Sequence, residues 1–170
     1  MPCLLDTNSF KNDLLKELPH LRGFARFLCK NTTLADDLVQ ETVVRALRAQ
    51  DQFVENTSLK AWLFTIQRNI FYEQKRRSSR EETVFQDYEK SQSEPTRNNN
   101  QNARDAITDL SSFLWELPDT LREAIILVGA QELSYEDAAA VCNVPIGTIK
   151  ARVSRARAQL AELAKEHSII

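Results

Sequence analysis

The chain has 170 residues, which is enough for one domain or two small ones. Its hydrophobic fraction of 42% supports real cores, while only three glycines and five prolines argue against a β-rich or fibrous chain. The net charge is −2, so the protein as a whole does not attract nucleic acid, and any such binding must come from local basic patches.

Cysteines and histidines are few and dispersed. Cys3, Cys29 and Cys142 form an odd, widely spaced set, and His20 and His167 are isolated. This pattern predicts no metal site, no disulfide framework and no cofactor, and it favours a reducing compartment. The N-terminus lacks a basic region followed by an apolar run, and no apolar stretch reaches membrane-spanning length. We therefore expect a cytoplasmic protein that makes no membrane contact.

The first predicted helices lie within residues 10–30, where apolar residues keep helical spacing except at Pro19. Because proline removes an intrahelical hydrogen bond, we expect two helices here or one kinked helix. A further helix is predicted over 34–49, with Thr32 or Thr33 as its cap. Its outer face is a mixed acidic patch with one apolar residue: Asp37, Gln40, Glu41 and Val44. That patch is either a protein-docking face or an ordinary solvated face.

After a polar loop at 51–57, Ser58 is placed to cap a long helix over 59–77. Between residues 60 and 80 there are six basic residues and one acidic residue, Glu73, with aromatic residues among them. Bases of single strands stack on aromatic rings while phosphates meet cations, so this pattern favours single-stranded nucleic acid. The alternative for Phe64 and Phe71 is that both pack in the core.

The segment 78–104 is polar, and we expect it to be a flexible linker. Phe85 and Tyr88 are apolar exceptions within it. A second helical unit is predicted to begin near residue 106, with one helix ending at Pro118 and another starting at residue 119 or 120. The sequence therefore predicts an all-α fold of two small helical domains, over 8–78 and 105–166, joined by a flexible linker over 79–104.

Residues 134–157 have the pattern of a helix-turn-helix. Ser134 and Asp137 fit a capping box, Asn143 tolerates the left-handed conformation of a turn, and Pro145 suits the start of a helix. The second helix carries an apolar face from Ile149 onward, and its basic residues point elsewhere: Lys150, Arg152, Arg155 and Arg157. Such a helix fits a DNA major groove, and the alternative is an amphipathic hairpin with a solvated basic face.

Two different basic helices joined by a tether suit an asymmetric site where a duplex is being opened. In these features the chain resembles the extracytoplasmic-function group of bacterial sigma factors, the promoter-specificity subunits of RNA polymerase. The similar stretches are 35–42, 58–69, 117–124 and 133–157. Two further stretches, 59–66 and 126–130, are most similar to the general-stress sigma factors of alphaproteobacteria.

The resemblance implies partners and residue roles. The β′ clamp helices of core RNA polymerase would contact Asp37, Gln40, Glu41 and Val44, and the β flap of the polymerase is a further expected partner. A base flipped from the single-stranded −10 element would lie in the loop formed by Glu55, Asn56, Thr57 and Ser58. The neighbouring backbone would be tracked by Lys60, Arg68, Tyr72, Lys75 and Arg76. The duplex −35 element would face Lys150, Ala151, Arg152, Ser154, Arg155 and Arg157. Trp62 and Ile149 are assigned to packing, and an anti-sigma factor in a stress response is a further expected partner.

Position 151 departs from the family pattern, because relatives often carry a small hydroxyl residue where this chain has Ala151. Alanine can touch a thymine methyl but donates no hydrogen bond. Three other hypotheses compete with a sigma factor: a sigma mimic that only captures an anti-sigma partner, a freestanding helix-turn-helix regulator, and an enzyme. No catalytic residue constellation or glycine-rich phosphate loop favours the enzyme, and no small-molecule substrate is expected.

Overall fold

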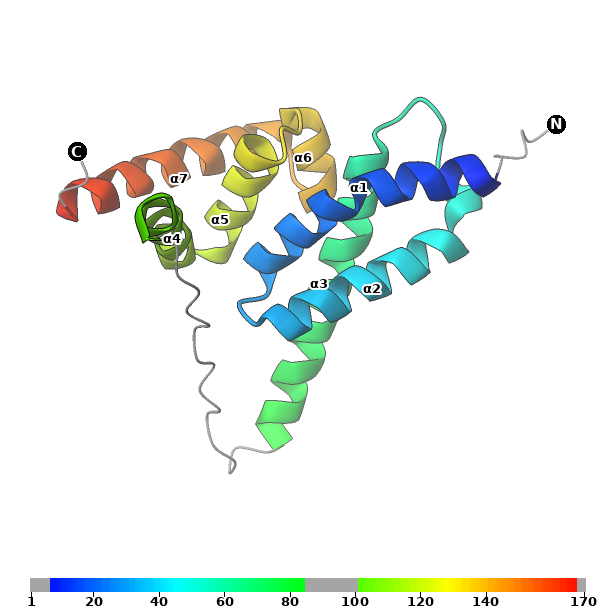
Figure 1. The fold of residues 1–170 in the computed structure, drawn as a ribbon, viewed down its shortest axis with the longest axis horizontal. Helices are drawn as coiled ribbons and strands as arrows, with labels where there is room; N and C mark the ends of the chain where they lie inside the picture. Colours follow the sequence, from blue (N-terminus) through cyan, green and yellow to red (C-terminus); the bar gives the residue numbers. More distant parts are fainter. Residues whose placement is uncertain (1–6, 85–100, 168–170) are drawn as a thin grey trace.

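The computed structural model describes residues 7–84 and 101–167, and its elements there are all helical, which confirms the expected fold class (Figure 1). The first unit contains α1 (Thr7–Leu28), α2 (Thr32–Arg48), the short 3-10 helix η1 (Gln50–Gln52) and α3 (Leu59–Val84). The second unit contains α4 (Gln101–Glu116), α5 (Asp119–Ile125), the π-helical turn η2 (Ile126–Ala130), α6 (Tyr135–Cys142) and α7 (Ile146–Glu166).

Helix boundaries differ from the predictions at three places. α1 continues through Pro19 as one helix, so two separate helices were a wrong alternative. Burial of Leu14 before the proline and Leu21 after it holds both halves in the same core. α3 continues beyond residue 77 and α4 begins before residue 106, so helix occupies both ends of the predicted linker. Residues 85–100, including Phe85 and Tyr88, lie outside the described residues.

Helix caps explain where two of these elements begin. Asn31 caps α2, because its side-chain oxygen accepts from the backbone N–H of Thr33 at 2.8 Å and of Leu34 at 3.2 Å. The predicted caps, Thr32 and Thr33, are therefore wrong. In the helix-turn-helix, the Ser134 hydroxyl accepts from the Asp137 N–H at 3.0 Å, as expected.

The turn between α6 and α7 is made by Asn143, whose backbone is left-handed with φ 54° and ψ 49°. This conformation is tolerated by asparagine, and it confirms the predicted turn position. α7 follows Pro145 directly, and its inner face buries Ile149, Val153 and Ala156.

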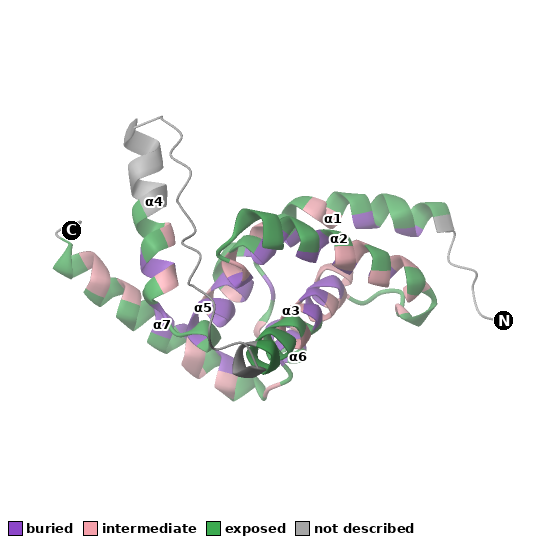
Figure 2. Ribbon diagram, turned by 90° about the horizontal axis from the view of Figure 1, so that it is seen from below, coloured by how far each residue is buried: buried purple, intermediate pink, exposed green. Residues whose placement is uncertain are grey.

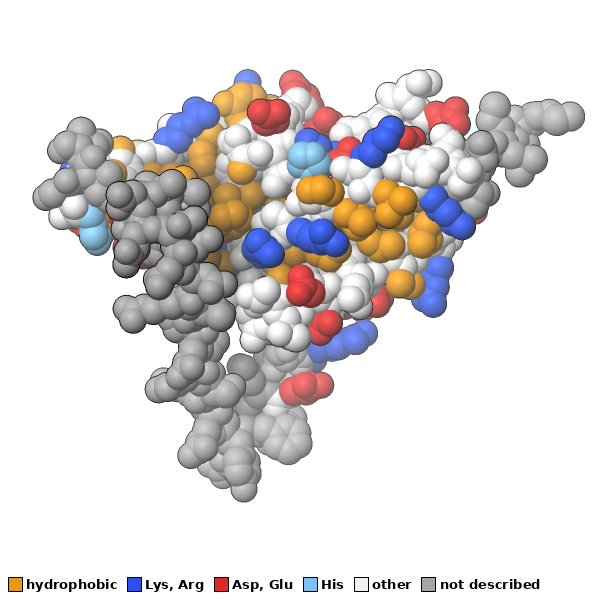
Figure 3. All heavy atoms as spheres, in the orientation of Figure 1, with side chains coloured by type: hydrophobic (Ala, Val, Ile, Leu, Met, Phe, Trp, Pro, Cys, Tyr) orange, Lys and Arg blue, Asp and Glu red, His pale blue; other side chains and the backbone are white. Residues whose placement is uncertain are grey.

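Buried residues follow the inner faces of the helices, while most outer faces are exposed (Figure 2). On the face shown in Figure 3, hydrophobic side chains also gather at the surface over α1 and α2, with lysine and arginine side chains among them. The exposed large hydrophobic residues of these two helices are Leu15, Leu34 and Val44.

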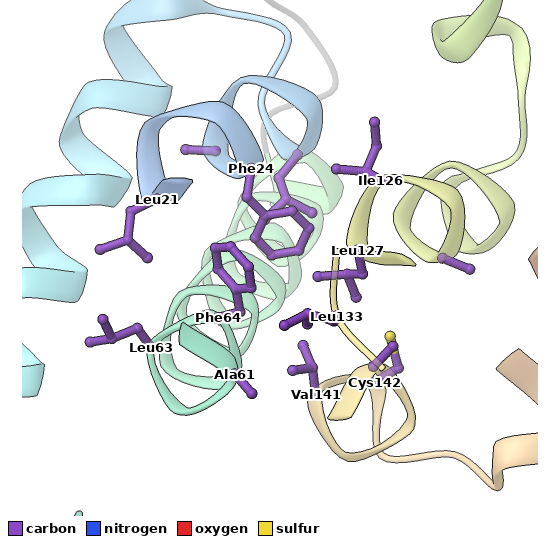
Figure 4. Close-up of a cluster of buried hydrophobic side chains, with 14 of the residues drawn as sticks. Leu21, Phe24, Ala61, Leu63, Phe64, Ile126, Leu127, Leu133, Val141 and Cys142 are labelled. Atoms are coloured by element: carbon purple, nitrogen blue, oxygen red, sulfur yellow. The ribbon is translucent and has the colours of Figure 1, made fainter. Parts of the chain in front are cut away.

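One hydrophobic core joins the two units. Phe24 of α1 and Phe64 of α3 are fully buried, with ring centroids 4.8 Å apart. The second unit contributes Leu127, Leu133 and Val141 to the same cluster (Figure 4). The sequence predicted two units joined by a tether, and the structure adds that these units pack directly against each other.

Candidate nucleic-acid interface

The outer face of α2 carries the four residues expected to dock on polymerase. Asp37 and Gln40 are exposed, Val44 is 40% exposed, and Glu41 is half-buried. Their spacing of three and four residues places them on one side of the helix. Arg45 donates to Glu41 at 3.0 Å, so the patch is held by an ion pair at its edge.

Arg45 also connects this face to α3, because it donates to Glu73 at 3.1 Å. The hydrogen bond from Arg45 lowers the pKa of the Glu73 carboxyl. Arg77 pairs with the other oxygen of Glu73 at 3.1 Å. The only acidic residue in the basic stretch of α3 is thus used to position α2.

The loop before α3 is shaped by one left-handed residue and two local hydrogen bonds. Asn56 has a positive φ of 66°, and the Thr57 hydroxyl donates to the Val54 carbonyl at 2.6 Å. Ser58 accepts from the Ala61 N–H at 3.1 Å and so caps α3, as predicted. The loop therefore presents Glu55, Asn56 and Thr57 to solvent, while the Ser58 hydroxyl has a structural role.

A pocket of about 420 Å³ lies between this loop and the N-terminal half of α1. Aromatic residues support it, because the Phe53 ring lies 6.1 Å from the Phe10 ring and 5.4 Å from the Trp62 ring, centroid to centroid. Trp62 therefore packs in this cluster, as expected. The pocket is lined by Ser9, Phe10, Asp13, Lys16, Glu17, Phe53, Glu55, Asn56, Thr57 and Leu59.

Most of the basic residues expected to track the −10 strand already have partners in the second unit. Lys60 Nζ donates to the Gln131 carbonyl at 3.1 Å. Lys75 Nζ lies 2.7 Å from an Asp119 oxygen, and Arg68 Nε donates to Glu123. In this arrangement α6 packs against α3, while acidic side chains of α5 and the Gln131 carbonyl pair with basic residues of α3.

Glu123 is the most buried acidic partner at this interface, with 1% of its side chain exposed against 18% for Arg68. Burial raises the pKa of the Glu123 carboxyl, and the Arg68 guanidinium opposes that shift. The Tyr72 hydroxyl donates to the second oxygen of Glu123 at 3.5 Å, and burial raises the pKa of Tyr72 to about 12. Arg68 also lies over the Tyr72 ring, 4.5 Å from its centroid. Two predicted DNA-contacting residues are thus bound by one carboxylate.

Asp119 forms the outer part of the same interface. It accepts from Lys75 and also from Arg122 at 2.6 Å, and the hydrogen bond from Lys75 lowers the pKa of its carboxyl. Arg122 in turn donates to the Phe27 carbonyl of α1 at 3.1 Å and stacks on the Trp115 ring at 4.2 Å. We did not predict these residues of α5 as site residues. Charges spaced by three and four residues on a short helix are the only sequence signal of their role.

The buried face of α3 differs from its expected composition. Phe64 is fully buried and Phe71 partly buried, so the core alternative holds for Phe64. Gln67, a polar residue, is also fully buried and donates to the Leu21 carbonyl at 3.0 Å. Arg76, by contrast, is exposed.

The recognition helix α7 presents an accessible surface. Lys150, Ser154, Arg155 and Arg157 are exposed, while Ala151 and Arg152 are half-buried. Ile149 is fully buried, as expected for a packing residue. The two basic helices therefore differ: α7 is open to solvent, and α3 is largely occupied.

Within residues 7–84 and 101–167 no cluster of three or more metal-ligating side chains is present. Cys29 and Cys142 have free thiols, and burial raises their pKa to about 11 and about 12. None of the helices in the described part of the chain is long and apolar enough to cross a membrane.

Comparison with known proteins identifies the class. Residues 14–81 match the family model of sigma-70 region 2, and residues 108–160 match that of sigma-70 region 4. The ECF RNA polymerase sigma factor EcfG of Rhodopseudomonas palustris (strain TIE-1) is 46% identical over 159 residues, which cover 92% of this chain and 86% of EcfG. The chain belongs to the extracytoplasmic-function sigma factors. Like other members of this family of transcription regulators, it binds core RNA polymerase and promoter DNA and directs transcription initiation.

Two solved structures are similar across both units. The sigma factor RpoE of Bartonella quintana, in complex with the anti-sigma factor NepR, is 46% identical; the match covers 92% of this chain and 97% of RpoE, with a TM-score of 0.78. CnrH, in complex with the cytosolic domain of CnrY, is 27% identical; the match covers 95% of this chain and 91% of CnrH, with a TM-score of 0.69.

Proposed function

We propose that the two units recognise the two elements of a promoter separately, with region two over 8–78 and region four over 105–166. α7 would read the duplex −35 element, since four of its six predicted contact residues are exposed on one helix. Arginine to guanine is the commonest specific pairing, and it discriminates by about 1–3 kcal/mol. Ala151, half-buried on this face, can contribute only an apolar contact.

At the −10 element, we propose that Glu55, Asn56 and Thr57 border the pocket that receives a flipped base. Lys60, Arg68, Tyr72, Lys75 and Arg76 would contact the adjacent backbone. The observation that carries this assignment is that these residues form one basic and aromatic face of α3, on which Arg68, Tyr72 and Lys75 pair with acidic groups. Carboxylates that pair with these cations stand in for the phosphates that the cations would otherwise meet.

We call the arrangement in which Glu123 and Asp119 of α5 pair with α3 the closed arrangement. It is then the DNA-free state, and α5 must leave α3 before the −10 strand can bind. The RpoE structure, which contains an anti-sigma factor, matches both units of this chain in a single superposition. We propose that an anti-sigma protein likewise controls this chain, in a stress response. The exposed apolar residues over α1 and α2 in Figure 3 are a suitable docking surface for such a partner. Val44 belongs both to this surface and to the proposed polymerase face, so the two partners would compete.

We further propose that the protein acts in the cytoplasm, where core polymerase is found, and performs no catalysis of its own. Run-off transcription tests the function: purified chain and core polymerase should give promoter-dependent transcripts on bipartite templates. If no transcript forms while the chain still binds an anti-sigma peptide, the chain is a sigma mimic and the promoter-binding roles are wrong.

A further inference from the structure

Gln131, the residue that follows η2, is bound to the first unit through both of its oxygen atoms. The His20 ring of α1 donates from Nδ1 to the side-chain Oε1 at 3.1 Å, because an amide oxygen can only accept. Lys60 Nζ of α3 donates to the backbone carbonyl at 3.1 Å. Only 8% of Gln131 is exposed, so water competes little for either oxygen. One residue thus connects the second unit to two helices of the first.

The position of Gln131 on α1 depends on a glycine. A Cβ atom added at Gly23 would lie 3.2 Å from Gln131 Nε2, closer than ordinary van der Waals contact. Gln131 cannot move aside freely, because His20, three residues earlier on the same side of α1, holds its amide. Within a helix glycine is less favourable than alanine, so close packing is the reason for a glycine here. We call His20, Gly23 and Lys60 the Gln131 seat.

The backbone around Gln131 is irregular. Its N–H donates to the Ile126 carbonyl at 2.9 Å, five residues earlier, in a π-helical turn. The next residue, Glu132, is left-handed with φ 58° although it is not glycine. Such conformations are uncommon and persist where surrounding contacts require them. Here the contacts on either side are the Gln131 seat and Leu133, which is buried in the core that the two units share. The irregular backbone is thus fitted to the packed arrangement of the two units.

We propose that Gln131 is an autoinhibitory latch: while it occupies its seat, the second unit stays closed over the −10 face of α3. In that state Lys60 donates to the Gln131 carbonyl instead of to a phosphate of the −10 strand. The inference rests on the proposed role of α3 in binding that strand. It adds a closing contact on α1 that is separate from the pair between Arg68 and Glu123 and that needs no acidic group.

The test uses the full chain without polymerase and two measurements. The first is the rate at which iodoacetamide alkylates Cys142, followed by peptide mass spectrometry. This thiol is buried in the shared core (Figure 4), so its rate reports separation of the units and requires no DNA. The second is the anisotropy of a fluorescent single-stranded oligonucleotide that covers the −10 region of a promoter active in run-off transcription.

Two single variants disturb the latch from opposite sides. Gln131→Ala removes the side-chain acceptor and leaves the His20 N–H without its partner. Gly23→Ala adds the methyl group that crowds Gln131, while alanine itself favours the helix, so α1 should not be destabilised. Each variant should raise both the alkylation rate and the −10 affinity about fivefold, the effect of losing roughly one buried hydrogen bond.

The double variant distinguishes a specific contact from general damage. Outside α1, no heavy atom of the described residues other than Gln131 Nε2 lies within 4 Å of the Cβ position at Gly23. With Gln131→Ala already present, Gly23→Ala should therefore change either value by less than about twofold, whereas independent effects would multiply to about 25-fold.

Gly147→Ala and Gln159→Ala are the matched controls. Gly147 lies in α7, and a Cβ atom added there would meet no atom within 4 Å outside that helix in the described part of the chain. Gln159 is an exposed glutamine of the same helix. Both variants should stay within about twofold of the parent values. Thermal melting followed by circular dichroism should show that every variant is folded.

The outcomes separate the latch from the function beneath it. If Gln131→Ala leaves the alkylation rate unchanged, or if the two substitutions multiply, Gln131 is not a latch, and the promoter role stands while parent holoenzyme binds the −10 strand. If alkylation becomes faster but −10 affinity does not rise, Gln131 joins the units without restraining the −10 face, and the autoinhibitory role is refuted. If parent holoenzyme does not bind the −10 strand, the proposed function and the autoinhibitory role both fail.

Discussion

The contact between Arg68 and Glu123 offers the sharpest test of the closed arrangement. Glu123→Gln removes a charge that is 1% exposed and leaves Arg68, which is 18% exposed, without its anionic partner. Breaking a fully buried ion pair costs about 3–5 kcal/mol. Because Arg68 keeps some contact with water, we expect a smaller loss, of about 2 kcal/mol, from the free energy that favours the closed state.

That loss should appear as a gain of binding. If closure competes with the −10 strand, a shift of about 2 kcal/mol raises the apparent affinity of the free chain for a −10 oligonucleotide by up to about 30-fold. Glu123 lies in the second unit and has no assigned DNA contact, so its replacement should not weaken the bound state. Fluorescence anisotropy with the free chain measures the effect.

The matched control is Glu136→Gln, which neutralises an exposed carboxylate of α6 in the same unit. It should leave the affinity within about twofold of the parent value. Unchanged or weaker binding by Glu123→Gln, with a normal melting transition, would show that the Arg68 contact does not restrain the −10 face.

Three further predictions concern Asp119, Arg155 and Cys142. Asp119→Asn should raise −10 affinity only two- to fivefold, since its pair with Lys75 is half-exposed and contributes at most about 1 kcal/mol. Arg122, the other partner of Asp119, keeps its hydrogen bonds to the Phe27 and Leu117 carbonyls. Because the pKa of Asp119 is lowered, this contribution is present at neutral pH and lost only below about pH 4, so the gain should be equal at pH 6 and pH 8; a gain that vanished at pH 6 would contradict this. Arg155→Ala should lose −35 discrimination in binding assays and keep core binding in gel filtration, whereas loss of core binding would refute its assigned role. Cys142 is buried and its pKa is raised to about 12, so it should react slowly with iodoacetamide at pH 8. Glu123→Gln should raise the rate of this reaction at least tenfold, as measured by peptide mass spectrometry. Equal rates would mean that the variant does not open the interface.

The helix-turn-helix could be predicted from the sequence because its determinants are local. The Ser134 cap, the left-handed Asn143 and the spacing of Ile149 and Val153 each act within one or two turns of chain. The all-α class follows from the same periodicity. Boundaries were less predictable: α3 continues past residue 77 through Arg80 and Glu81, which are good helix formers, although no apolar stripe marks this extension.

The packing of the two units could not be read from the chain. An apolar stripe that contains Phe24 or Phe64 predicts burial, but it does not say whether the covering residues come from the same unit or from Leu127 and Val141 of the other (Figure 4). Likewise, the charge of Glu123 gave no sign that it would be buried against Arg68, a residue 55 positions away. The chemistry of the −10 face was therefore predictable, and its occupation by α5 was not.

The most direct test of the account is the distance between the two units before and after polymerase binds. A donor and an acceptor dye can be attached to cysteines introduced at the exposed positions Asp51 and Glu166, with the natural cysteines replaced. The efficiency of energy transfer should be uniform in the free chain and should change markedly when core polymerase binds, as α5 leaves α3. The same transfer efficiency in the free chain and in an active holoenzyme would contradict the account, because the −10 face would then function while still covered.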